Sequence, residues 1–300
     1  MDKISVERYY RQCRLCGRQC LADRRVGRGA CGMSEGLMIS RAALHHWEEP
    51  PISGSRGSGT VFFSGCSLSC LYCQNKDISH GGFGASVTVK RLRDIMLELM
   101  DKGAHNINLV TPTHFTPSIA LAIDLAREKG MTLPIVYNTG GYDSPEALGL
   151  MEGRVSVYLP DLKYYRSSTA KALSGVDDYP ERARQAIAEM YRQVGRPVIE
   201  QGIMTRGVIV RILLLPGHLA EAKLNLKYLY ENYGDNIYIS LMNQYTPMPN
   251  MPPPLNRTPT SSEYGELTDY ALRLGVTNAF IQEGEAQSES FIPPFDLSGV

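Results

Sequence analysis

The sequence predicts an α/β fold in which a parallel sheet, closed as a full or a partial barrel, follows a small N-terminal cysteine-rich segment. Two observations support this prediction. Short apolar runs alternate with longer helical patterns along most of the 300 residues, an order that favours parallel strands joined by right-handed crossovers. All seven cysteines lie within the first 73 residues, in two tight groups. A chain of this length suits one large domain with a modest appendage.

Seven short runs predict the strands. Each run is apolar and nearly unbroken, as is typical of parallel strands buried on both faces. They cover residues 60–64, 106–111, 134–138, 155–161, 208–214, 237–242 and 278–282. Helical patterns between them cover residues 89–102, 117–129, 144–151, 178–194, 219–233 and 261–274. Thr116–Pro117 and Ser144–Pro145 each place a capping hydroxyl before a proline in the first turn.

The remaining segments predict how the chain is divided. Residues 1–52 form the cysteine-bearing segment, and the glycine- and serine-rich stretch 53–59 predicts a flexible joint after it. The barrel then covers residues 53–283. The proline-rich composition of residues 245–259 predicts a long surface loop. Residues 284–300 are expected to form a C-terminal tail that packs on the core.

Composition narrows the functional classes. The formal net charge is zero, and without a basic excess we expect no nucleic-acid partner. No apolar stretch reaches the roughly twenty residues that span a bilayer, and the charged N-terminus lacks the apolar core of a signal peptide. An odd number of cysteines with C-x2-C spacing indicates metal ligation in a reducing compartment. We therefore expect a cytoplasmic protein without a membrane partner.

The cysteine triplet is the strongest functional feature. Cys66, Cys70 and Cys73 form a C-x3-C-x2-C pattern after the run 60–64. Three thiolates on one loop hold three irons of a 4Fe–4S cluster and leave the fourth iron open to a chelating ligand, such as the amino and carboxylate groups of S-adenosylmethionine (SAM). The alternatives are a zinc knuckle and an electron-transfer cluster completed by a remote ligand.

The cysteine quartet forms a second predicted metal site. Cys13, Cys16, Cys20 and Cys31 have C-x2-C-x3-C-x10-C spacing, and four thiolates complete a tetrahedral site. Structural zinc and an auxiliary iron–sulfur cluster both accept four tetrahedral sulfurs, so the spacing does not separate them. A pair of disulfides is the third alternative, and a reducing compartment disfavours it.

Polar residues follow several of the predicted strands. The carboxyl ends of parallel strands meet at one mouth of a βα barrel, where chemistry gathers. The alternative role for each residue is a strand cap or a loop hydrogen bond, and for Arg211 an ion pair inside the barrel. Besides the triplet, these candidates are Thr111, Thr113, His114, Asn138, Thr139, Asp161, Lys163, Arg211, His218, Asn243, Gln244 and Glu283.

The triplet, with Tyr72 directly before its last cysteine, resembles the signature of the radical SAM superfamily. Within that superfamily, later motifs resemble the pyruvate formate-lyase activating enzyme group, in particular its homologues with an N-terminal cysteine segment. The resemblance covers most of residues 60–250. The activating enzymes carry Gly-Gly-Glu where this chain has Thr111-Pro-Thr-His. The matching stretches are Asn108-Leu-Val-Thr-Pro-Thr-His114, Tyr137-Asn-Thr-Gly-Gly-Tyr142, Tyr158-Leu-Pro-Asp-Leu-Lys163, Arg211-Ile-Leu-Leu-Leu-Pro-Gly-His218 and Met242-Asn-Gln-Tyr-Thr-Pro247.

The resemblance implies a partial (β/α)6-type barrel and a radical reaction. A reduced cluster, supplied by a one-electron donor such as flavodoxin or ferredoxin, would cleave SAM to methionine and a 5′-deoxyadenosyl radical, which abstracts a hydrogen atom. The expected substrate is a backbone glycine, which would make the protein an activating enzyme of a glycyl radical enzyme. The alternatives are a radical SAM enzyme acting on a small molecule or another peptide, and a non-catalytic iron–sulfur or zinc-binding protein.

The resemblance also implies cofactor contacts. Thr111, Thr113 and His114 would contact the methionine amino group or the adenine, and Asn138 and Thr139 the ribose or carboxylate. Lys163, oriented by Asp161, would neutralise the SAM carboxylate, and Arg211 is an alternative clamp for it. Asn243 and Gln244 would reach the ribose hydroxyls. Tyr72 is also expected beside the cofactor.

Overall fold

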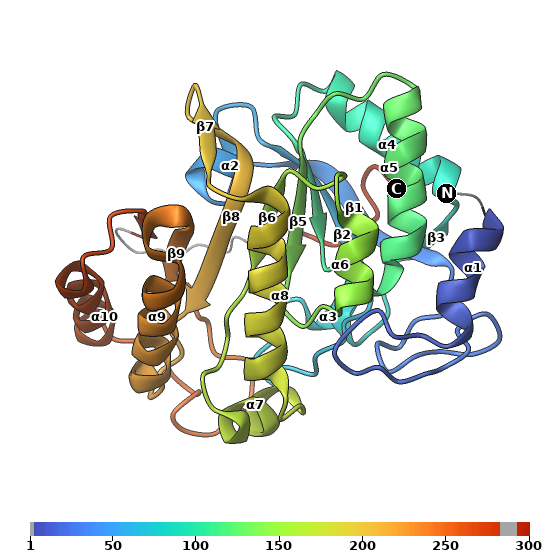
Figure 1. Ribbon diagram of the computed structural model, residues 1–300. Helices are drawn as coiled ribbons and strands as arrows, with labels where there is room; N and C mark the ends of the chain where they lie inside the picture. Colours follow the sequence, from blue (N-terminus) through green and yellow to red (C-terminus); the bar gives the residue numbers. More distant parts are fainter. Residues whose placement is uncertain (1–2, 283–292) are drawn as a thin grey trace.

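A single mixed sheet organises the fold. The computed structural model describes residues 3–282 and 293–300, and the strands of its sheet run in the order β10-β9-β8-β6-β5-β4-β2-β1-β3 (Figure 1). Each pair from β2 to β10 along this order is parallel. Because β3 and β10 lie at opposite ends of the order, the barrel is partial, which confirms the predicted fold class. The parallel strands are β2 (Ser58–Phe63), β4 (Ile107–Val110), β5 (Ile135–Thr139), β6 (Val157–Pro160), β8 (Ile203–Leu213), β9 (Tyr238–Met242) and β10 (Ala279–Ile281).

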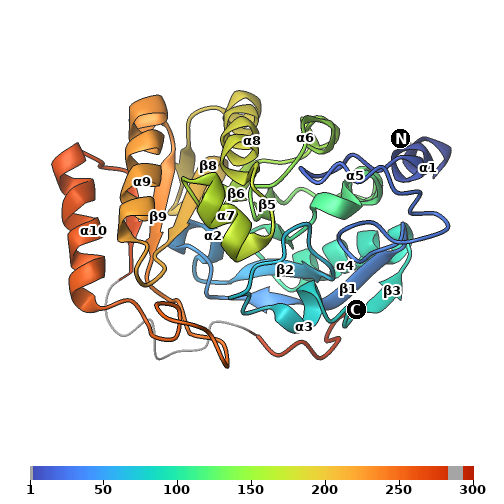
Figure 2. The same cartoon turned by 90° about the horizontal axis from the view of Figure 1, so that it is seen from below.

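Helices cover the outer face of this sheet, as Figures 1 and 2 show. All six predicted helices are present, with bounds that differ by a residue or so from the predicted ranges. Their inward faces carry buried aliphatic side chains, such as Leu92 and Ile119, so hydrophobic burial fixes them on the sheet. These helices are α4 (Val89–Asp101), α5 (Thr116–Glu128), α6 (Pro145–Met151), α8 (Tyr179–Val194), α9 (Leu219–Tyr233) and α10 (Ser261–Leu274).

One of the two predicted helix caps is confirmed. The Ser144 Oγ accepts a hydrogen bond from the Ala147 N–H at 3.2 Å. The prediction for Thr116 is wrong, because a short 3-10 turn, η1 (Thr113–Phe115), precedes α5 and makes Thr116 its first residue. The Thr116 hydroxyl instead donates to the Thr113 carbonyl at 2.6 Å.

The predicted flexible joint is also wrong. Ser53 is buried at the end of α2 (Pro50–Ser53), and Ser58 and Gly59 are the first residues of β2. Both are buried, and the Ser58 hydroxyl donates to Asn106 Oδ1 at 2.5 Å. Residues 53 and 57–59 are therefore packed within the fold, and residues 54–56 form an exposed turn between α2 and β2.

Other elements were not predicted from the sequence. Strand β1 (Leu37–His45) pairs antiparallel with β2 and with β3 (Ala85–Val87), so part of the N-terminal segment belongs to the main sheet. The remaining unpredicted elements are α1 (Lys3–Arg11), α3 (Lys76–Ser79), α7 (Ser167–Ser174), β7 (Val198–Glu200) and η2 (Gly234–Asn236).

The C-terminal residues lie against β1. The Ala42 N–H donates to the Ser298 carbonyl at 2.8 Å, and the Leu297 N–H donates to the Ser40 carbonyl at 3.1 Å. This placement agrees with the predicted packing for residues 293–300. Residues 284–292 of the predicted tail and Glu283 lie outside the described residues. The predicted loop 245–259 contains turns without a helix or strand.

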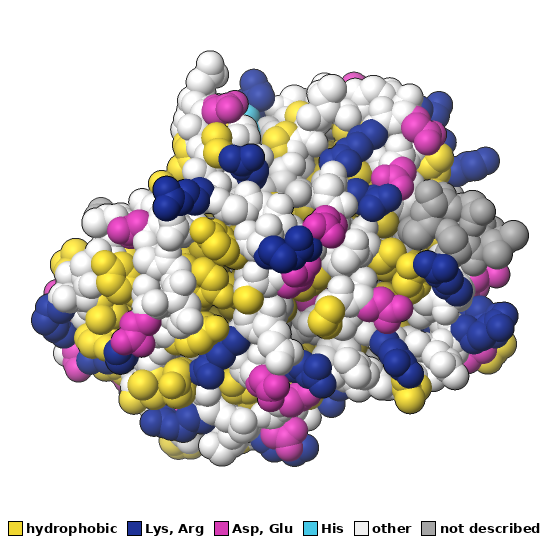
Figure 3. Space-filling model, in the orientation of Figure 1, with side chains coloured by type: hydrophobic (Ala, Val, Ile, Leu, Met, Phe, Trp, Pro, Cys, Tyr) yellow, Lys and Arg dark blue, Asp and Glu magenta, His cyan; other side chains and the backbone are white. Residues whose placement is uncertain are grey.

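The outer surface is mixed in charge on the face shown in Figure 3, where Lys and Arg alternate with Asp and Glu. Within residues 3–282 and 293–300, none of the helices combines the length and the apolar character of a membrane span.

Candidate active site

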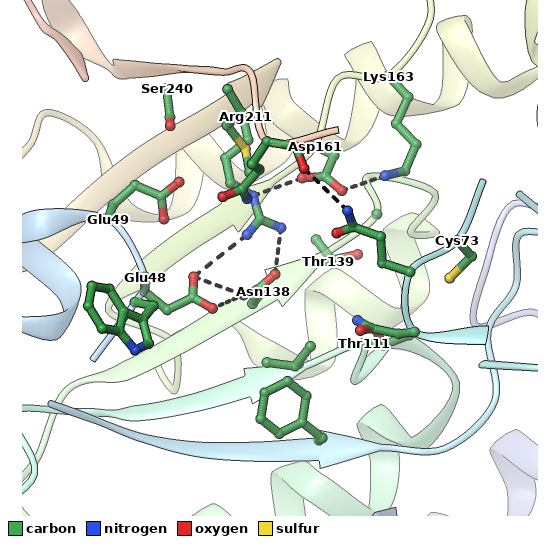
Figure 4. A pocket seen from close by; sticks show the side chains of 18 of the residues that line it. Glu48, Glu49, Cys73, Thr111, Asn138, Thr139, Asp161, Lys163, Arg211 and Ser240 are labelled. Atoms are coloured by element: carbon green, nitrogen blue, oxygen red, sulfur yellow. Dashed lines mark hydrogen bonds and ion pairs between the residues drawn. The ribbon is translucent and has the colours of Figure 1, made fainter. Parts of the chain in front are cut away.

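A cavity of about 610 Å³ opens at the carboxyl ends of the parallel strands. Its size lies within the range of roughly 300–1,000 Å³ that is usual for ligand pockets. The loop after β2, the ends of β4, β5, β6, β9 and β10, part of β8, and the segment between β1 and α2 form its walls. Figure 4 shows the side chains that face this space. The predicted mouth of the barrel is therefore a real pocket.

The cysteine triplet forms one wall of the cavity. Cys66, Cys70 and Cys73 all line it, and each sulfur has a polar neighbour. The Cys66 Sγ accepts from the Leu68 N–H at 3.4 Å, the Cys70 Sγ lies 2.9 Å from the Ser174 Oγ, and the Cys73 Sγ lies 3.2 Å from the Ser79 Oγ. Burial raises the pKa of the Cys70 thiol, and the nearby Lys163 ammonium opposes this rise.

The residues of this loop fit a three-cysteine cluster site. Three thiols on one short loop face a common cavity, and Lys163 offsets negative charge beside them. The chain enters the loop at Gly65, which has a φ of 85°. A Cβ at Gly65 would lie 2.4 Å from the Met33 Cγ, so only glycine lets the loop approach the N-terminal segment this closely.

A network of charged side chains occupies the cavity beside the cysteine loop. Asp161 receives the Lys163 Nζ at 2.6 Å and the Arg211 Nε at 2.8 Å. The Arg211 Nη2 also donates to Asn138 Oδ1 at 2.7 Å, and its Nη1 lies 3.6 Å from Glu48 Oε2. Although burial opposes the effect, Arg211 and Lys163 hold the pKa of Asp161 below its ordinary value. The network therefore keeps two cations fixed and charged in the cavity.

Seven of the predicted cofactor contacts line the cavity: Thr111, Asn138, Thr139, Asp161, Lys163, Arg211 and Gln244. Thr111 also has an unusual backbone. Its φ is 58°, a region that a β-branched residue rarely adopts. Its N–H donates to the Asn138 carbonyl at 2.8 Å, and this bond helps to hold the strained turn at the cavity wall.

The structure does not bring Tyr72, Thr113, His114 and Asn243 to this cavity. The η1 turn directs Thr113 and His114 into the core, where the Thr113 hydroxyl donates to Asp143 Oδ1 at 2.7 Å and His114 Nε2 lies 2.7 Å from the Ser64 carbonyl. The Tyr72 hydroxyl lies 2.7 Å from that of Tyr164. The Asn243 side chain is also buried. All four residues are therefore buried outside the cavity lining.

The acidic part of the cavity was not predicted from the sequence. Glu48 and Glu49 line it, together with the neighbouring Trp47. Burial raises the pKa values of both carboxyl groups, that of Glu49 to about 7. The sequence signal that could have identified these residues is the pair of acids directly before Pro50–Pro51. If β1 had been predicted, the two acids would have followed a strand end, as the other candidates do.

The cysteine quartet lies outside the cavity. Cys13, Cys16 and Cys31 are buried, and Cys20 is exposed. Burial raises the pKa values of Cys16 and Cys31, and the backbone N–H groups of Arg18 and Met33 oppose this rise. The described part of the chain contains no group of three or more His, Cys, Asp or Glu side chains arranged around a single metal ion.

The quartet is joined to the barrel by Arg24, which is fully buried. Its guanidinium lies 3.7 Å from the Cys13 Sγ and donates to the carbonyls of Met33, Ser34 and His114. The cysteine segment is therefore fixed to the η1 turn, which carries His114 and follows β4.

The fold and the cavity define a partial-barrel protein with a ligand pocket at the carboxyl ends of its strands and three cysteines on the loop after the first parallel strand. Residues 60–223 match the family model of the radical SAM superfamily, and the chain belongs to this superfamily. The superfamily uses a 4Fe–4S cluster and SAM, and the triplet and the fixed cations fit these two groups.

The chain is also similar to individual known proteins in sequence or in fold. It is 27% identical over 248 residues to the uncharacterised protein MJ0674 of Methanocaldococcus jannaschii, covering 79% of this chain and 67% of that protein. SuiB of Streptococcus suis, in a crystal structure with bound S-adenosylmethionine, has a similar fold with a TM-score of 0.53 and 12% identity over 74% of this chain. Its complex with the precursor peptide SuiA gives a TM-score of 0.51. The chain spans about half the length of SuiB, covering 49% of it.

Proposed function

We propose that this protein binds SAM in the cavity and abstracts a hydrogen atom from a polypeptide, with a backbone glycine of a glycyl radical enzyme as the reacting residue. The observation that carries the proposal is the meeting of the cysteine triplet with the Asp161–Lys163–Arg211 network in one cavity. When bound, the cluster and SAM supply one-electron chemistry that ends in hydrogen-atom abstraction.

The chain's own residues would bind and orient the cofactor. Lys163 and Arg211 present fixed positive charges, which suit the SAM carboxylate. Asp161 holds both in place through its two oxygens. Thr111, Thr139 and Gln244 add polar groups along the same walls, and these suit ribose or amino-group contacts.

Two features support a polypeptide as the substrate: the size of the cavity and the sequence stretches that resemble the activating enzyme group. A volume of about 610 Å³ suits one drug-sized ligand, so a bound cofactor leaves room for only a small part of a substrate. A short backbone segment with one side chain meets this condition. The stretches that resemble the activating enzyme group favour glycine as the reacting residue. The proposal includes a flavodoxin- or ferredoxin-like electron donor and a cytoplasmic location.

The experiment that tests this function measures 5′-deoxyadenosine under anaerobic conditions, with reconstituted protein, SAM and dithionite. Wild type should form it, and Cys70→Ala should not. Electron paramagnetic resonance of a candidate glycyl radical enzyme after incubation should then show a glycine-centred radical. Absence of 5′-deoxyadenosine with wild type would refute the radical reaction. If 5′-deoxyadenosine forms only when a small molecule is consumed, and no glycyl radical appears, the proposal of a polypeptide glycine as the substrate is refuted.

We also propose that the quartet holds a second metal centre, since its spacing supplies four thiol ligands and the charge of the buried Arg24 guanidinium acts on Cys13 and Cys31. Metal analysis separates the two options: about four irons and one zinc per chain indicate structural zinc, and about eight irons indicate an auxiliary cluster. Cys31→Ser should lose only the second metal. A wild type with about four irons and no zinc would refute this site.

A further inference from the structure

Glu48 and Glu49 form a second group of functional side chains in the cavity. They follow β1 and directly precede α2. Figure 4 shows them on the opposite side of the view from Cys73. The side chain of Glu48 is 11% exposed, and Glu49 is 8% exposed as a residue. Two neighbouring buried carboxylates cost free energy unless cations or hydrogen-bond donors satisfy them.

The two carboxylates differ in their partners. Glu48 accepts from Asn138 Nδ2 at 3.3 and 3.4 Å and lies 3.6 Å from the Arg211 Nη1. Among the described residues, Glu49 Oε2 is fully buried and has no hydrogen-bond partner. Glu49 occupies the N-cap position of α2, yet its side chain accepts no hydrogen bond from that helix. The Oε2 atom of this carboxylate is therefore available to a ligand.

The charges around the cavity are unequal. Glu48, Glu49 and Asp161 supply three carboxylates within the described lining, while Lys163 and Arg211 are the two permanent cations. Both cations contact Asp161, and only Arg211 also approaches Glu48. The imidazole of His45 also lines the cavity, and burial lowers its pKa, so it adds little positive charge at neutral pH. Three carboxylates thus share two cations: the charge of Arg211 also acts on Glu49 and opposes the rise of its pKa, yet Glu49 Oε2 keeps no hydrogen-bond partner among the described residues.

Aromatic side chains line the same cavity as the two carboxylates. Trp47, Phe62 and Phe280 line the same cavity, and Phe280 is stacked on Tyr238 with ring centroids 4.9 Å apart. Aromatic faces attract organic cations, whereas a hard metal ion such as Ca²⁺ requires six to eight oxygen ligands. A cavity lined by both carboxylates and aromatic rings therefore favours an ammonium or a guanidinium group over a metal ion.

We propose that Glu48 and Glu49 bind the cationic side chain of a lysine or arginine in the substrate polypeptide. This inference rests on the proposed function, because it describes the substrate of that same reaction. The subsite fixes one side chain of the polypeptide at the end of the cavity away from the cysteine loop. The residue to be attacked then lies between this anchor and the cofactor.

The test compares two small probes that differ in charge. N-acetyl-lysine N-methylamide carries the ammonium group, and N-acetyl-norleucine N-methylamide is its neutral analogue. Calorimetric titration of cluster-reconstituted protein at about pH 8.5, without reductant, measures binding without turnover. Wild type should bind the cationic probe about tenfold more tightly than the neutral one, as expected for a hydrogen bond to a charged group. Glu49→Gln should lose this preference.

Glu200→Gln is the matched control, because Glu200 is exposed on β7 and should leave the preference unchanged. Thermal unfolding of each variant shows whether the fold is kept. Equal affinity of wild type for both probes, or an unchanged preference in Glu49→Gln, overturns the proposal. The proposal is also overturned if SAM displaces the probe and Glu49→Gln binds SAM more weakly than wild type does. These two results together would assign the subsite to the cofactor. A wild type that binds the probe but forms no 5′-deoxyadenosine refutes the proposed function alone.

Discussion

The Arg211 Nε donates to Asp161 Oδ1 over 2.8 Å, and this ion pair joins β8 to the residue that follows β6. The second oxygen of Asp161 receives the Lys163 Nζ at 2.6 Å. One carboxylate therefore positions both cations that we assign to the cofactor. Asp161 acts as a positioning residue, and its loss should affect stability and cofactor binding together.

Asp161→Asn tests this role. The change leaves two partly buried cations without their carboxylate, which should lower the free energy of unfolding by about 3 kcal/mol. It should also weaken SAM binding, because Lys163 and Arg211 lose their fixed positions. Chemical denaturation and calorimetric titration with SAM measure the two effects. Glu231→Gln is the control, since it breaks only the exposed pair with Lys227 and should change stability by less than about 1 kcal/mol. Normal SAM affinity in Asp161→Asn would contradict the role.

The parallel part of the fold could be predicted because its strands are buried on both faces. Runs such as 155–161 are apolar throughout, and this pattern is distinctive. Strand β1 was missed because Arg41 interrupts its apolar pattern: this side chain reaches outward to Asp296 at 2.6 Å, a partner more than 250 positions away in the chain. Long-range pairing of this kind leaves no local signal in the sequence.

The site could be predicted only in part, for a related reason. Asn138 and Asp161 come directly at or after strand ends, and they face the cavity as expected. Thr113 and His114 also follow a strand, yet the η1 turn carries them into the core. The direction of a loop side chain depends on a turn that the residue types do not specify. Glu48 and Glu49 were missed because the strand before them was missed.

Arg24 provides the second prediction, because it connects the cysteine segment to the barrel. It is fully buried, and its guanidinium donates to three carbonyl groups. Arg24→Lys keeps the charge, but a single ammonium cannot reach all three acceptors. We expect a loss of about 2 kcal/mol in unfolding free energy and faster thiol labelling of Cys13 and Cys31 in metal-free protein. Arg25→Lys, on an exposed pair with Asp23, is the control. Equal labelling rates in the two variants would argue against this connection.

Glu49 gives a prediction about pH. Burial raises its pKa from the ordinary value of 4.5 to about 7. Between these values the folded protein holds a proton that the unfolded chain has lost, so this group stabilises the fold at low pH and its contribution falls as the pH rises. Glu49→Gln removes the titration. Its stability relative to wild type should therefore increase from about pH 5 to about pH 8, by up to about 3 kcal/mol. Denaturation curves at both pH values measure this difference, and a constant difference would show that Glu49 is not the group responsible.

Ser174 gives the last prediction, which concerns the cluster itself. Its hydroxyl is fully buried and lies 2.9 Å from the Cys70 Sγ and 2.6 Å from the Tyr164 hydroxyl. Hydrogen bonds to cluster sulfurs raise the reduction potential, because they stabilise the more negative reduced state. Ser174→Ala should lower the potential of the reconstituted cluster by roughly tens of millivolts, measured by redox titration. Ser118→Ala also removes a buried hydroxyl, one that contacts Tyr10 at 2.9 Å, and should leave the potential unchanged. If both variants shift the potential equally, the effect comes from packing and the hydrogen bond to Cys70 does not tune the cluster.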